Sequence, residues 1–153
     1  MFKKINFKKI LIWVLILIFL VLLQIKLGLI LNYKFNLTLL ALIVFSFYVG
    51  YLELIFLSLL GIFLINWKPN FSLEIILLFL IPQLFYLTLK KIKWDNFFGL
   101  IFFIILGDIL FYGLINYKFI LDFTNYFIYE ILINILFGIL LFYFLKYLNH
   151  NER

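Results

Sequence analysis

Cysteine is absent from this 153-residue chain, and histidine occurs once, as His150. Without cysteine, neither a disulfide nor a thiolate metal site can form. The lone histidine lies in a polar tail beside Asn149 and Asn151, where a solvated side chain is favoured over a zinc ligand or a catalytic base. We therefore predict no metal and no cofactor.

Sequence signatures of catalysis are missing as well. The chain has no glycine-rich phosphate loop, no HExxH motif, no serine in a G-x-S-x-G setting and no close pair of aspartates. Asp108 is the only aspartate within an apolar run, which argues against an aspartic membrane protease. We predict that the protein is not an enzyme.

Charge is scarce and apolar residues are abundant. Hydrophobic residues make up 68% of the chain and charged residues 13%, with a mean hydropathy of +1.24. A soluble domain is about half apolar and about a quarter charged, so this chain has more apolar surface than a small soluble core could bury. The formal charge of +6 comes from lysines near the apolar runs, which favours anionic lipid over nucleic acid as a partner. We predict an all-α integral membrane protein.

Four apolar runs are long enough to cross the hydrocarbon layer, which takes about 20 helical residues. They cover residues 10–27, 72–89, 96–115 and 126–148. The first run resembles a signal peptide, but no small-residue cleavage site follows it, so we interpret it as a retained helix. A fifth run, 37–67, is too long for one ordinary span and short for two, and Gly50 and Glu53 interrupt it near its middle.

The placement of basic residues favours two short helices in the 37–67 run, because lysines in short loops stay on the cytoplasmic side. Two helices put nine of the 13 basic residues inside and four outside, whereas one helix puts six inside and seven outside. We therefore predict six transmembrane helices with both termini in the cytoplasm. The chain then divides into a basic N-terminus (1–9), a six-helix transmembrane domain (10–148) and a tail (149–153). The short second and third helices must be tilted, re-entrant or shielded by their neighbours.

Polar residues inside the runs form a possible intramembrane cluster or interface near the outer leaflet. Its predicted members are Gln24, Glu74, Asp108, Glu130 and Asn134. Helical rise places Asp108 about 10 Å and Asn134 about 12 Å from the outer ends of their helices, so the two share a depth. The helix dipole alone explains an acid in a first turn, as at Glu74, and it is one of two explanations for Glu130. Asp108 lies too deep for that, and both a structural hydrogen bond and a functional contact stay open for it.

Small and polar residues also share helix faces in the last two runs. The first such stripe is Gly99, Phe103 and Gly107, and the second is Tyr126, Glu130, Asn134 and Gly138. Stripes of this kind mark contacts between membrane helices. We predict that the last two helices pack together, with Asp108 bonded near Asn134 or Glu130. Pro82, in the middle of the fourth helix, is predicted to kink it and to free a backbone carbonyl.

Several short motifs resemble the bacterial rod-shape-determining protein family MreD, whose members are small and consist of little but five or six helices. The motifs are Leu23-Gln24 at the end of the first helix, the polar-leucine opening 36–40 of the second, Gly50 and Gly61 around the third, and the stretch from Asn134 to the basic exit at Lys146. The chain departs from the family in the third helix, where the family has a closer glycine pair and a final aspartate. Asp108 also matches no family motif.

The resemblance implies a non-enzymatic scaffold of the cell-elongation (rod-shape, peptidoglycan-synthesis) complex in the bacterial inner membrane. The implied partners are a periplasmic bitopic shape protein, the actin-like filament and the peptidoglycan polymerase. The alternative is the substrate-binding S subunit of an energy-coupling-factor vitamin transporter, which has a similar size, six helices and an outward-facing pocket. The cluster of polar residues near the outer leaflet suits that alternative. The lack of an alanine-rich face on the first helix argues against it.

Overall fold

The computed structural model describes residues 7–31, 36–66, 72–91 and 96–150, and the regular structure in these ranges is entirely α-helical. The helices are α1 (Phe7–Leu31), α2 (Leu37–Phe45), α3 (Tyr51–Ile65), α4 (Leu73–Lys91), α5 (Asn96–Asp122) and α6 (Thr124–His150). Of these, α1, α4, α5 and α6 are long and apolar enough to cross a membrane, and α3 is a shorter apolar helix. The predicted all-α membrane fold is confirmed.

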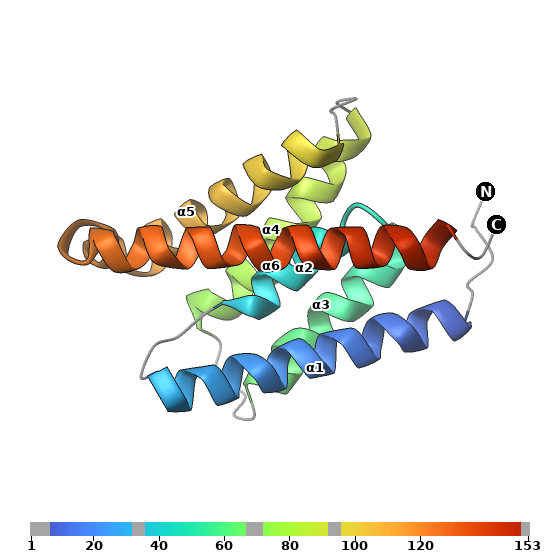
Figure 1. Cartoon of the computed structure of the whole chain (residues 1–153), viewed down its shortest axis with the longest axis horizontal. Helices are drawn as coiled ribbons and strands as arrows, with labels where there is room; N and C mark the ends of the chain where they lie inside the picture. Colours follow the sequence, from blue (N-terminus) through green and yellow to red (C-terminus); the bar gives the residue numbers. More distant parts are fainter. Residues whose placement is uncertain (1–6, 32–35, 67–71, 92–95, 151–153) are drawn as a thin grey trace.

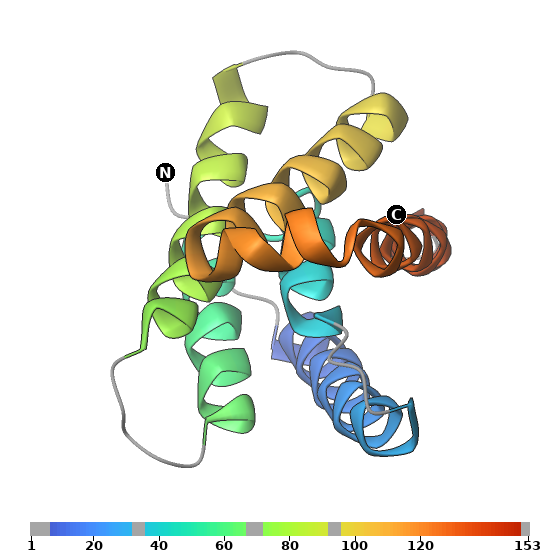
Figure 2. The ribbon, with the colours of Figure 1, turned by 90° about the vertical axis from the view of Figure 1, so that its left-hand side faces the viewer.

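The ambiguous run contains two helices, as predicted. Only nine residues long, α2 rises about 13 Å, which is less than half the hydrocarbon layer. Every one of its residues is buried, and it packs against all five other helices. A helix that is apolar all round belongs inside a protein, so the short helix is shielded by its neighbours. Figure 2 shows α2 in the middle of the bundle in an end-on view.

Local hydrogen bonds define where α2 ends and α3 begins. The Asn36 side chain caps α2 by accepting a hydrogen bond from the Leu39 amide at 3.2 Å. At the other end, the Ser46 hydroxyl donates to the Ile43 carbonyl at 2.6 Å. The Glu53 carboxylate accepts from the Gly50 amide at 2.8 Å in the first turn of α3. The break therefore falls at Gly50, where the sequence places it.

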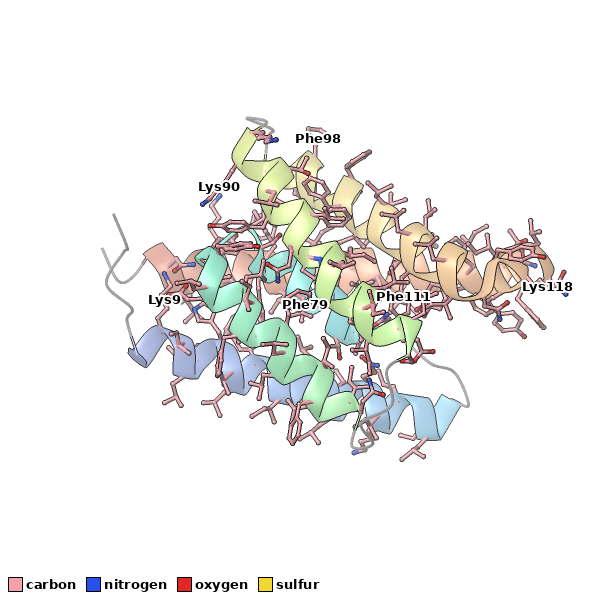
Figure 3. All side chains as sticks on the ribbon, turned by 180° about the vertical axis from the view of Figure 1, so that it is seen from behind. Lys9, Phe79, Lys90, Phe98, Phe111 and Lys118 are labelled. Atoms are coloured by element: carbon pink, nitrogen blue, oxygen red, sulfur yellow. The ribbon has the colours of Figure 1, made fainter. Side chains whose placement is uncertain are left out.

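Helices α1 and α6 lie along the long axis of the molecule, and α3, α4 and α5 run obliquely to it (Figure 1). The first turn of α1 and the last turn of α6 lie at the same end, hereafter the termini end (Figure 1). Lys9 and Lys90 lie toward this end, and Lys118 lies at the opposite one (Figure 3). This arrangement is the one expected for a chain that begins and ends on one side of a membrane. The assignment of that side to the cytoplasm stays a prediction.

Several boundaries differ from the predicted spans. Helix α1 begins at Phe7 and α6 ends at His150, so the helices extend beyond the predicted 10–148 domain. Helix α5 continues past the predicted end at Ile115, but Asn116 has a non-helical backbone (φ −154°, ψ 77°), so regular helix does stop there. Pro82 lies inside α4, which is one continuous helix from Leu73 to Lys91. The predicted kink stays a prediction, and residues 1–6 and 151–153 of the predicted termini lie outside the described residues.

Candidate intramembrane polar site

Glycines bring α5 and α6 close to α2 and to one another. A Cβ atom built on Gly107 would lie 2.6 Å from the Ile43 Cδ1 atom of α2. A Cβ atom on Gly138 would overlap the Ile104 side chain of α5 and would lie 3.0 Å from the Leu40 Cδ1 atom of α2. A larger residue at either position would force the ends of the Ile43 or Ile104 side chains to move, so the two glycines let the three helices approach closely without that rearrangement.

The buried face of α6 follows the predicted stripe with one correction. Glu130, Asn134 and Gly138 are buried as expected, but Tyr126 is 58% exposed. Phe127 occupies the buried position in its place. The reason is the 3.6-residue period of a helix, since strict four-residue steps drift around its axis over several turns.

Asp108 of α5 and Asn134 of α6 form the hydrogen bond that the sequence predicts. The Asn134 Nδ2 atom donates to the Asp108 Oδ2 atom at 2.9 Å. Both side chains are withdrawn from the surface, with 2% and 0% of their area exposed. A bond of this kind favours the association of two membrane helices, because in lipid no hydrophobic driving force brings their apolar faces together.

A second bond lies one helical turn away on the same two helices. The Tyr112 hydroxyl, on the turn after Asp108, donates to the carboxylate of Glu130, on the turn before Asn134. Glu130 is fully buried and lies close enough to Asp108 to interact with it electrostatically. We call Asp108, Tyr112, Glu130 and Asn134 the α5–α6 polar ladder.

Tyr112 is not among the site residues predicted from the sequence, although the residue spacing pointed to it. Tyr112 follows Asp108 by four residues, and Glu130 precedes Asn134 by four. In two antiparallel helices this spacing places the second pair beside each other once the first pair is in contact. The Asp108–Asn134 bond therefore predicts the Tyr112–Glu130 bond.

One acceptor in the ladder is not used. Within the described part of the chain, the Asn134 Oδ1 atom has no hydrogen-bond partner, although the side chain is completely buried. A buried acceptor without a partner costs free energy. The ladder can therefore take one further donor at Asn134, such as a water molecule or a polar ligand atom.

The other two predicted cluster residues make separate arrangements. The Gln24 Oε1 atom of α1 accepts hydrogen bonds from the Thr38 amide at 2.9 Å and the Thr38 hydroxyl at 2.8 Å, at the start of α2. Glu74 is exposed in the first turn of α4, which agrees with the helix-dipole explanation. Asp108, Glu130 and Asn134 are thus together, Gln24 joins α1 to α2, and Glu74 is at the surface.

A further polar contact joins α3 to α4. The Gln83 Nε2 atom donates to the Ser58 hydroxyl at 3.1 Å, and both side chains are buried. Among the described residues, the Gln83 Oε1 atom has no partner. The Pro82-Gln83 pair stands out in the sequence for its effect on the backbone, and this side-chain bond was not predicted.

No family model, curated protein or solved structure matches the chain.

Proposed function

We propose that the protein is a non-enzymatic membrane scaffold, similar to MreD, in the cell-elongation complex of a bacterial inner membrane. Its partners in this proposal are a bitopic shape protein, the actin-like filament and the peptidoglycan polymerase. The proposal starts from the sequence motifs that resemble that family. It is supported by what those motif residues do in the folded chain.

The observation that carries the proposal is the junction between α1 and α2. Two motif segments, Leu23-Gln24 and the opening of α2, meet there through both hydrogen bonds that Gln24 accepts from Thr38. Asn36, in the second segment, caps the same helix. Because α2 is too short to span the bilayer, it is held by its neighbours, and this junction adds directed hydrogen bonds to the apolar packing around it. Polar side chains that hold a buried helix in place support a structural role, as expected for a scaffold.

The burial of the α5–α6 polar ladder also supports a structural role. Asp108, Glu130 and Asn134 have at most 2% of their area exposed, and each has a bond from one helix to the other. A ligand pocket open to the outside would leave such groups accessible. Their enclosure favours helix association over ligand capture.

Affinity purification of the tagged chain from membranes of its own host tests the proposal. We expect the shape protein and the actin-like filament protein to co-purify with it. Gln24→Leu removes the oxygen atom that accepts both hydrogen bonds from Thr38. This change should loosen the contact between α1 and α2 and so reduce the recovery of the two partner proteins. Thr88→Val is the control, because the Thr88 hydroxyl donates to the Leu84 carbonyl of its own helix, at 2.8 Å. Recovery of paired transporter ATPases without the shape proteins would contradict the proposal.

The alternative, an S subunit of a vitamin transporter, is favoured by one observation, the unpartnered Asn134 Oδ1 atom beside Asp108. Asp108→Asn separates the two proposals. An amide at position 108 accepts the existing hydrogen bond and can also donate to the Asn134 Oδ1 atom. For a scaffold we therefore expect an unchanged melting temperature in detergent.

The discriminating readout is thermal stabilisation by a panel of vitamins. A transporter with Asp108 in its pocket would be stabilised by one vitamin as the wild type, and this stabilisation would be lost in Asp108→Asn. For a scaffold, neither form responds to any vitamin. A vitamin response that Asp108→Asn abolishes would therefore reject the scaffold.

A further inference from the structure

Two acidic side chains of the α5–α6 polar ladder are enclosed within helices that are otherwise apolar. Asp108 lies inside the apolar stretch Phe97–Asp122, and Glu130 lies inside Thr124–Asn149. The two side chains are 2% and 0% exposed, and they are close enough to interact electrostatically. A carboxylate enclosed beside another acid is costly, because burial removes its hydration and like charges repel. A charged Asp108 would therefore need a positive charge next to it.

No lysine side chain that the structure describes is buried near Asp108. Lys118 of α5 and Lys146 of α6 are both exposed. The other helices packed on α5 are α2, which has no titratable residue, and α4. The titratable residues of α4 are the exposed Glu74, Lys90 and Lys91, and Tyr86, whose ring lies 5.5 Å from that of Tyr51 in α3. The titratable side chains that lie with Asp108 are thus Glu130 and Tyr112 of the ladder.

Only the nitrogen of the Asn134 amide has a partner among the described residues. Its Nδ2 atom donates to the Asp108 Oδ2 atom at 2.9 Å, whereas the equally buried Oδ1 atom accepts no hydrogen bond from the described chain. A primary amide and a protonated carboxyl group can form two parallel hydrogen bonds, in which the NH₂ group donates to one carboxyl oxygen and the OH group donates to the amide oxygen. The first of these two bonds is present. A proton on the Asp108 Oδ1 atom would complete the second.

We infer that Asp108 binds a proton at neutral pH and donates it, in a hydrogen bond, to the Asn134 Oδ1 atom. The proton removes the charge of Asp108 beside Glu130, and it gives the buried amide oxygen a donor. A proton requires no cavity, so the site is compatible with the close packing of α5 on α6. The inference concerns the ladder alone and does not depend on the proposed function.

The bound proton makes the α5–α6 contact sensitive to pH. When the proton leaves, the Asp108 carboxylate faces a buried amide oxygen and the neighbouring Glu130, and both interactions are repulsive. Because the folded chain holds a proton that an unfolded aspartate releases, raising the pH lowers the stability of the folded chain. The contact should therefore weaken as the pH becomes alkaline.

Infrared spectroscopy of the full chain in detergent at neutral pH tests whether the proton is there. A protonated carboxyl group has a carbonyl stretching band that is separate from the bands of a carboxylate and of the peptide groups. We expect a component of this band that is present in the wild type and missing in Asp108→Asn. Asp122→Asn is the matched control, because Asp122 is an exposed aspartate of the same helix, and it should keep the component.

Asn134→Leu tests the pairing with the amide. It removes both hydrogen bonds from the Asp108 carboxyl group, so the component should move to higher wavenumber in this variant, and a melting curve would show that the variant folds. An unchanged position in the folded variant would overturn the pairing. Absence of the component from the wild type, or its loss in Glu130→Gln while Asp108→Asn keeps it, would overturn the inference.

The pH dependence of thermal unfolding is a second test. As the pH is raised from neutral to alkaline, the wild type should lose melting temperature relative to Asp108→Asn, and Asp122→Asn should follow the wild type. Replacing sodium chloride by choline chloride at constant pH should change none of these curves. A pH-independent difference between the wild type and Asp108→Asn would overturn the inference. Stabilisation of the wild type by sodium that is lost in Asp108→Asn would also overturn it, because a metal cation would then take the place of the proton.

Discussion

The short helix α2 and the pair of long helices α5 and α6 are held in the bundle by different interactions. All nine residues of α2 are buried, and apolar side chains surround it on every side. Each of the long helices has 27 residues, with many large apolar side chains exposed on the outside. Between them lie Gly138 of α6 and the polar ladder. A helix that is too short to span the bilayer must be enclosed by protein. Long helices that face lipid associate instead through close backbone approach and hydrogen bonds between polar side chains.

The largest expected effect comes from breaking the close approach of α6. In Gly138→Leu the new side chain would overlap Ile104 of α5 and press against Leu40 of α2. We expect a loss of about 2–3 kcal/mol of stability from overpacking, measured by circular dichroism during titration with SDS. Gly113→Leu is the control, because a Cβ atom there comes no closer than 3.9 Å to Ile120. Equal stability of the two variants would contradict the packing described for α6.

A smaller loss is expected when the ladder loses one member. Asp108→Leu leaves the buried Asn134 amide without the acceptor that it now has at 2.9 Å. We expect a destabilisation of about 1–2 kcal/mol in the same titration, because an unpaired buried donor is costly even between membrane helices. Asp108→Asn keeps an acceptor and serves as the control. If the leucine variant were as stable as the asparagine variant, the ladder would contribute nothing to helix association.

The smallest loss of stability is expected at the start of α2, where apolar packing contributes most of the stabilisation. Thr38→Val removes the hydroxyl bond to Gln24 but keeps the backbone bond beside it. We expect a loss of about 0.5–1 kcal/mol. Thr88→Val, which removes a hydroxyl bond to Leu84 of the same helix, should change stability less. An effect larger than that of Asp108→Leu would reverse the comparison between the two regions.

Some of this arrangement is readable from the sequence, because it depends on distance along the chain. Gly50 marks the break between α2 and α3, and Asn116 interrupts α5 directly after the predicted span. Helical rise alone places Asp108 and Asn134 at one depth, and the structure joins them. Depth and spacing are properties of a single helix. They do not require knowledge of its neighbours.

The features that the sequence analysis missed depend on position around the bundle. Gln24 is predicted to lie in the same outer half of the membrane as Asp108, but α1 packs on α2 and α3, so its partner is Thr38. Four-residue spacing suggested a buried Tyr126, whereas the helical period brings Phe127 inward. The Gln83–Ser58 bond joins α3 to α4, a pairing that no spacing along the chain indicates. Because these helices carry apolar residues on every face, their hydrophobic pattern does not indicate which face is buried.

The 37–67 run forms two helices, the buried α2 and then α3, and this puts the end of α4 on the same side as the start of α1. The absence of cysteine allows a direct test with single substitutions in an otherwise unreactive chain. Lys90→Cys and Lys118→Cys would be treated, in intact cells, with a maleimide that does not cross membranes. The account predicts that only Lys118→Cys is labelled before the cells are opened. Labelling of Lys90→Cys from outside intact cells would contradict it.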